Sequence, residues 1–174
     1  MSRRRYRSAV CAVALCVASS LTGCASSGRL HVATPATSRL SHFETILVRV
    51  SSDLADARKE TIQLEATVAK IARETLSYRR VLTERAAPGS SADLTIEARI
   101  VGLEKVGVES RARRGMLAGR ARMIADVALT DSSTGVVLAR FTAEGRSSVV
   151  GSTEQAIVRV SEQILAFVAA HFNA

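Results

Sequence analysis

Five arginines lie close together in residues 110–125, which we call the arginine segment: Arg111, Arg113, Arg114, Arg120 and Arg122. No acidic residue lies in this segment. Because planar guanidinium groups pair with phosphate and carboxylate, the arginines are a candidate docking surface for phosphate head groups or for an acidic partner. The alternative is a solvated connection between two strands, whose charges favour solubility. Nucleic-acid binding is disfavoured, because no aromatic side chain that could stack on a base lies between Tyr78 and Phe141.

Cys24 is the second residue whose type and surroundings point to chemistry. It ends the sequence Leu21-Thr22-Gly23-Cys24, after an apolar stretch at residues 9–20 and an arginine-rich start. The stretch is too short to span a bilayer, which needs about 20 residues. The whole pattern resembles the signal peptide and lipobox of bacterial lipoproteins, in which small residues admit the peptidase and the Cys thiol takes a diacylglycerol group. We therefore expect residues 1–23 to be removed and Cys24 to be lipidated, with palmitate-type chains.

Two further features of the sequence bear on the export route and on the membrane in which the protein is anchored. Residues 2–6 resemble a twin-arginine export signal, with general secretion as the alternative. Ala25 follows the Cys in place of the Asp that commonly retains lipoproteins at the inner membrane. We therefore expect the protein at the outer membrane, facing the periplasm.

The composition excludes several classes of protein. The chain has 174 residues and a formal net charge of +8, and the four arginines of residues 1–23 account for half of that charge. With Cys11 and Cys16 removed and Cys24 lipidated, no thiol remains for a disulfide or a metal site. The three histidines lack ligand or base partners at motif spacing: His31, His42 and His171. We expect no catalytic residues, no metal, no cofactor and no small-molecule substrate. The protein is therefore expected not to be an enzyme.

The hydrophobic pattern predicts one α+β domain. Residues 24–42, small and polar after the Cys, are predicted to be a flexible tether, and residues 43–174 a single periplasmic domain. Alternating apolar residues predict strands at 43–50, 78–83, 92–103, 119–130 and 136–147. Apolar stripes of helical period predict helices at 58–77 and 153–172, the second with a capping box at residues 152–155. The expected architecture has two layers: a mostly antiparallel sheet of four to five strands with two helices packed on one face.

Three segments carry a resemblance to a known family: residues 92–100, 115–122 and 127–139. They resemble the bacterial lipoproteins that carry the domain of unknown function 4410, over about residues 43–172. The resemblance implies an α/β sandwich similar to periplasmic domains of envelope assembly and secretion lipoproteins. It implies no catalytic residue.

These observations lead to one functional expectation and one alternative. We expect an envelope lipoprotein that is held to the membrane through Cys24 and carries a non-enzymatic domain that binds a protein partner or assembles with itself. The alternative is an accessory or channel subunit of an envelope export or assembly system. A channel subunit would need an apolar strand pair to enter the membrane, whereas each strand from residue 92 onward has a charged face.

Overall fold

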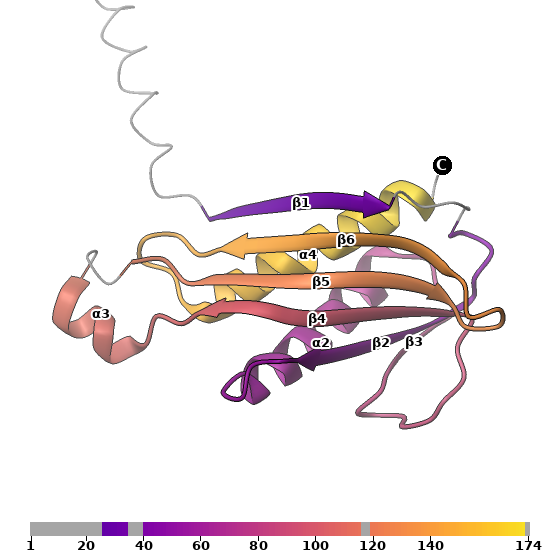
Figure 1. Cartoon of the computed structure of the whole chain (residues 1–174), viewed down its shortest axis with the longest axis horizontal. Helices are drawn as coiled ribbons and strands as arrows, with labels where there is room; N and C mark the ends of the chain where they lie inside the picture. The colour runs from indigo at the N-terminus through magenta and orange to yellow at the C-terminus, as the bar shows by residue number, and fades with distance from the viewer. Residues whose placement is uncertain (1–25, 35–39, 116–118, 173–174) are drawn as a thin grey trace, which may run out of the picture.

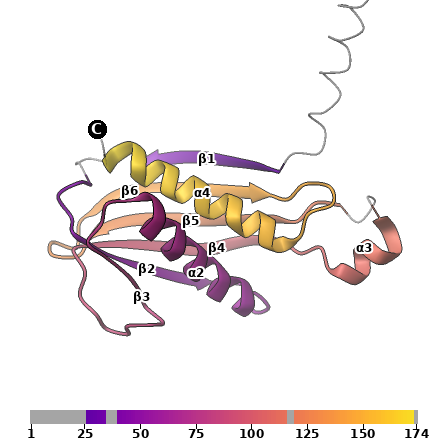
Figure 2. The same cartoon turned by 180° about the vertical axis from the view of Figure 1, so that it is seen from behind.

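The computed structural model describes residues 26–34, 40–115 and 119–172, which form one six-stranded sheet and three helices. The elements, in chain order, are β1 (Ser27–Thr34), β2 (Thr45–Ser52), α2 (Arg58–Thr75), β3 (Arg80–Thr83), β4 (Leu94–Glu104), α3 (Val108–Arg114), β5 (Arg122–Asp131), β6 (Val137–Arg146) and α4 (Thr153–Phe172). Helices α2 and α4 lie side by side on one face of the sheet, and α3 extends past one end of it (Figures 1 and 2). The α+β class is confirmed.

The strands follow the order β1-β6-β5-β4-β2-β3 across the sheet. Strand β2 pairs in parallel with both of its neighbours, and the other three pairings are antiparallel. The parallel pair β2–β3 is joined through α2, as a crossover between parallel strands requires. Each of the predicted strands and both predicted helices exist, with ends that shift by a few residues.

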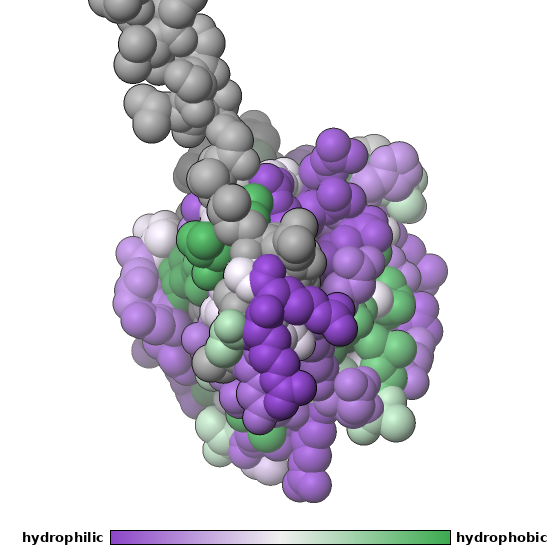
Figure 3. All heavy atoms as spheres, turned by 90° about the vertical axis from the view of Figure 1, so that its left-hand side faces the viewer, coloured by the Kyte–Doolittle hydropathy of each residue, from purple (hydrophilic) through white to green (hydrophobic). Residues whose placement is uncertain are grey.

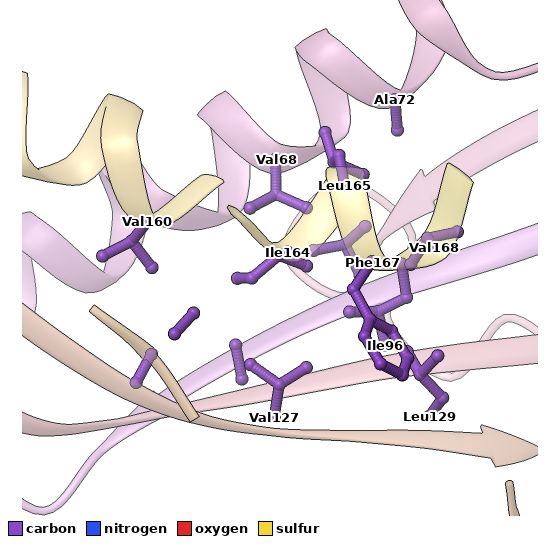
Figure 4. Close-up of a cluster of buried hydrophobic side chains, with 14 of the residues drawn as sticks. Val68, Ala72, Ile96, Val127, Leu129, Val160, Ile164, Leu165, Phe167 and Val168 are labelled. Atoms are coloured by element: carbon purple, nitrogen blue, oxygen red, sulfur yellow. The ribbon is translucent and has the colours of Figure 1, made fainter. Parts of the chain in front are cut away.

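The hydrophobic core lies between the sheet and the two long helices. Figure 4 shows side chains of α2 and α4, such as Val68 and Ile164, directed toward Ile96 and Val127 on the sheet. Among the residues of this core are Leu64, Val68, Ala72, Ile96, Met123, Val127, Phe141, Val160, Ile164 and Val168. The rings of Phe141 and Phe167 stack with centroids 4.2 Å apart. Val160 and Ile164, which lie on the apolar stripe of the helix predicted at residues 153–172, are fully buried.

Gly145 in β6 allows α4 to approach the sheet closely. A Cβ atom at this position would meet the backbone of α4, at the carbonyl oxygen of Ala156 and, 2.8 Å away, the amide nitrogen of Val160. Any larger residue would push the helix outward.

The capping box predicted at residues 152–155 is wrong in one respect. In such a box the Gln155 side chain would bond to Ser152, whereas in the structure it accepts a 2.8 Å hydrogen bond from the Ser148 amide.

The sheet has six strands rather than four to five, because Ser27–Thr34 form strand β1. The prediction of a flexible tether over residues 24–42 is therefore wrong for this segment, and the domain begins before residue 43. The strand pairs with β6 from Ser27 opposite Arg146 to Thr34 opposite Arg140. It is an edge strand whose residues are almost all exposed, so it carries no pattern of buried residues. Residues 1–25, with Cys24, and 35–39 lie outside the described part of the chain.

Candidate docking surface

Helix α3 was not predicted, and it contains three of the five candidate arginines. It lies in the connection between β4 and β5, whose ends are held by the pairing of Glu104 with Arg122. The helix has seven residues, with an acidic residue, Glu109, in its first turn. It ends at Gly115, whose φ of 53° is the left-handed conformation in which helices commonly stop.

Arg113 and Arg114 are exposed on α3. Neither forms an ion pair with any residue that the structure describes. Arg120, just before β5, is also exposed. Arg111 belongs to α3 by its backbone, but its side chain lies outside the described part of the structure. The structure thus places three described arginines at the surface of one end of the sheet.

Arg122 differs from the other candidates because it is bound within the sheet. Its Nε donates to Glu144 at 2.8 Å and its Nη2 donates to the same carboxylate at 3.1 Å. Its Nη1 lies 3.7 Å from Glu104, and Arg146 donates to Glu144 at 2.6 Å. The hydrogen bonds from Arg122, supported by those from Arg146, lower the pKa of Glu144 to about 2 against the opposing effect of burial. The sequence showed arginines without a nearby acid, but the fold brings acids from the neighbouring strands to Arg122.

The sheet face opposite the long helices contains a shallow groove of about 510 Å³ that also gathers charged side chains. Arg49 lies 3.0 Å from both Glu84 and Glu97. Arg99 lies 3.6 Å from Asp53 and 3.8 Å from Asp126. Hydrogen bonding to Glu84 is the main cause that raises the pKa of Arg49.

Both carboxylates that line the groove, Glu97 and Asp126, are thus ion-paired, and both are about half exposed. Thr142 also donates a 2.9 Å hydrogen bond to Asp126. A general acid or base is usually a carboxyl whose pKa is raised by burial away from compensating charge. In the groove, by contrast, the two carboxylates are exposed to solvent and paired with arginines, as is typical of the solvated face of a sheet.

Two further features concern the described residues, which are 26–34, 40–115 and 119–172. Within these ranges, no group of three or more His, Cys, Asp or Glu residues is arranged to hold a metal ion. No helix in the same described ranges has the length and apolar character needed to cross a membrane.

Comparison with known proteins gives a fold but no family. No family model and no curated protein matches the chain. The PelC dodecamer from Paraburkholderia phytofirmans aligns with a TM-score of 0.53 at 14% identity, covering 82% of this chain and 97% of that one. A substituted form of the same dodecamer aligns at 0.55 with 12% identity and the same coverage. Protein XCC0632 from Xanthomonas campestris, a DUF330 protein, aligns at 0.56 with 15% identity, covering 81% and 90%. The fold of this chain is therefore one that is shared among bacterial proteins.

Proposed function

We propose that this chain is an envelope lipoprotein whose signal peptide, residues 1–23, is removed and whose Cys24 carries the acyl chains. The Leu21–Cys24 motif supports this, together with the place where the fold begins. Among the described residues, the first strand is Ser27–Thr34 and the core extends from Leu40 to Val168. Loss of residues 1–23 therefore removes none of the core residues that the structure describes. Because Ala25 follows the Cys, the proposed location is the outer membrane, on the periplasmic side.

We further propose that the domain is not an enzyme and that it assembles with copies of itself. The open edge of β1 carries this proposal. Strand β1 pairs only with β6 among the described strands, and it exposes Leu30 and Val32. An exposed strand edge presents unpaired backbone groups that another chain can bind. PelC, which has a similar fold, is a dodecamer. The ion-paired carboxylates of the groove support a role without catalysis.

The finer family assignment is part of this proposal. The three segments that resemble the domain of unknown function 4410 supply β4, the residues that lead into β5, and the hairpin between β5 and β6. The first segment therefore lies mainly in β4, and the third spans the end of β5 and the start of β6, which are three neighbouring strands of the sheet.

Lipidation is tested in cells. Globomycin, which blocks the lipoprotein signal peptidase, should make the unprocessed precursor accumulate. The mature protein should have the mass of residues 24–174 plus its acyl chains. A Cys24→Ser protein should no longer fractionate with membranes. Processing that is insensitive to globomycin, or membrane fractionation of the Cys24→Ser protein, would contradict the proposed anchor.

Self-assembly is tested on the lipidated protein in detergent by light scattering or native mass spectrometry. The parent should be oligomeric at micromolar concentration, and Val32→Lys should shift it to the monomer, because lysine on an edge strand opposes pairing. Val136→Lys, at an exposed residue of the β5–β6 hairpin, is the matched control and should leave the oligomer intact. A monomeric parent, or equal effects of the two lysines, would exclude assembly through β1.

A further inference from the structure

The beginning of β1 fixes where a lipid anchor can lie relative to the domain. Ser27 pairs with Arg146, and Arg159 of α4 donates a 2.7 Å hydrogen bond to the Ser26 hydroxyl. Cys24 precedes Ser26 by two residues, which span at most about 7 Å of extended chain. An acylated Cys24 would therefore bring the membrane surface close to the first residues of β1, with no long spacer between them.

The same end of the sheet carries α3. Ser27, Arg146, Arg122 and Glu104 are successive partners across β1, β6, β5 and β4. Adjacent strands lie 4.7–4.9 Å apart, so this row of four residues spans about 15 Å. Helix α3 begins shortly after Glu104 and extends beyond the strands at the end where β1 starts (Figure 1). The opposite end of the sheet carries the β5–β6 hairpin.

The arginines of α3 add positive charge at this end. Arg122 and Arg146 share the carboxylate of Glu144, so their charges are partly compensated. Arg113 and Arg114 have no such carboxylate among the described residues. Figure 3 looks onto this end and shows hydrophilic residues gathered over its centre.

From this juxtaposition we infer that α3 faces the leaflet that holds the anchor, and that Arg113 and Arg114 bind the anionic head groups of its lipids. The inference rests on the proposed lipidation of Cys24. Guanidinium groups match phosphate in geometry and charge, and their attraction to an anionic surface acts within a Debye length, about 8–10 Å. The short distance between Cys24 and Ser26 keeps this end of the domain in that range. The acyl chains would fix the protein to the membrane, and α3 would fix its orientation.

The orientation can be measured with a single fluorescent label on the lipidated protein. The mature chain has no Cys besides the acylated Cys24, so Ala112→Cys places one reactive thiol on the exposed surface of α3. Ser133→Cys places it in the β5–β6 hairpin at the opposite end. Each labelled protein is reconstituted into vesicles that contain a head-group quencher. One set of vesicles is neutral phosphatidylcholine, and the other contains about 30% phosphatidylglycerol.

The label at residue 112 should be quenched in the anionic vesicles and much less in the neutral ones, while the label at residue 133 stays unquenched. Arg113→Ser with Arg114→Ser should abolish the difference, as should high salt. Each arginine near an anionic surface changes partitioning about fivefold, so the double variant should weaken vesicle binding of the protein without acyl chains roughly 10- to 30-fold. The matched control is Arg79→Ser with Arg80→Ser, two exposed arginines near the opposite end of the sheet.

Equal quenching of the two labels, or the same quenching with and without Arg113 and Arg114, would overturn the inference. Protection of α3 by an acidic protein from the envelope, with no quenching by anionic vesicles, would also overturn it and assign the arginines to a protein partner. If the protein purified from cell membranes carried no acyl chains and did not float with neutral vesicles, the proposed lipidation would be contradicted instead. An acylated protein that floats equally on both vesicles with an unquenched α3 would contradict only the orientation.

Discussion

At the scale of single residues, Glu144 is the carboxylate of the described sheet that accepts the most hydrogen bonds from arginines. It receives two from Arg122 and one from Arg146, and its side chain is largely buried. Hydrogen bonds to charged groups contribute more to stability than neutral ones, at about 1.5–3 kcal/mol. Glu144 therefore holds β5 and β6 together at the end of the sheet where α3 begins.

This arrangement predicts a specific pH dependence of stability. The pKa of Glu144 is about 2 in the folded protein, below the value of about 4.3 expected for an unfolded chain. Its contribution is therefore complete above about pH 5 and is lost as the pH falls toward 2. Glu144→Gln should lower the free energy of unfolding by about 1–3 kcal/mol at pH 7 and flatten the decline between pH 5 and 2. Urea unfolding at both ends of this range measures the effect.

Glu97→Gln is the matched control for this experiment. Glu97 also bonds an arginine, but its side chain is 46% exposed, and exposed ion pairs contribute less than about 1 kcal/mol. The control should change stability little and keep the parent's acid slope. If Glu144→Gln and the control gave the same slope, the assigned pKa of Glu144 would be wrong.

At the scale of elements, α4 makes the closest contact between the helical layer and the sheet. Gly145 admits its backbone, and Ile164 lies fully buried beneath it. Ile164→Ala should lower the free energy of unfolding by about 2–5 kcal/mol, because it removes buried methyl groups and leaves a cavity. Val158→Ala on the same helix is the control, since Val158 is 38% exposed and should cost well under half as much. Thermal or urea melts of the three proteins provide the comparison, and similar midpoints would show that this face of α4 does not pack on the sheet.

A second prediction at this scale concerns amide exchange in strand β1. The pairing of β1 with β6 should protect its amides, which a flexible tether would leave exposed. The amides of residues 26–34 that bond to β6 should exchange with deuterium far more slowly than those of the hairpin loop at residues 132–135. Amide exchange followed by mass spectrometry on the lipidated protein reads both segments in one experiment. Exchange of residues 26–34 at the rate of an unstructured peptide would show that this segment is a tether, as the sequence predicts. The domain would then not begin within a few residues of Cys24.

At the scale of the whole molecule, the sequence predicts those strands and helices that have one buried face and one exposed face. In β4, for example, Ile96 and Ala98 alternate with Glu97 and Arg99, because helices cover one side of the sheet and solvent the other. Helix α4 shows the matching 3.6-residue stripe, and its predicted range of 153–172 agrees with Thr153–Phe172. A pattern of this kind is present whenever an element has one buried side.

The elements and contacts that could not be predicted either bury little apolar surface or depend on residues far away in the sequence. Strand β1 is almost wholly exposed, and its partner β6 lies more than 100 residues later in the chain. Helix α3 is short and its described side chains are exposed, so no stripe marks it. The arginines were visible as a group, but only the register of β4, β5 and β6 separates Arg122, which is bound by acids, from Arg113 and Arg114.

The position of β1 also determines how the molecule would carry a mechanical load. The strand runs along the long axis of the domain, and an anchor at Cys24 would pull on its first residues (Figure 1). Tension along that axis, applied by anything attached to the hairpin end, loads the hydrogen bonds between β1 and β6 in shear, all at the same time. A sideways force opens them one after another, starting at Ser27. The attachment is therefore strong when the domain is drawn straight away from the membrane and weak when it is peeled to one side.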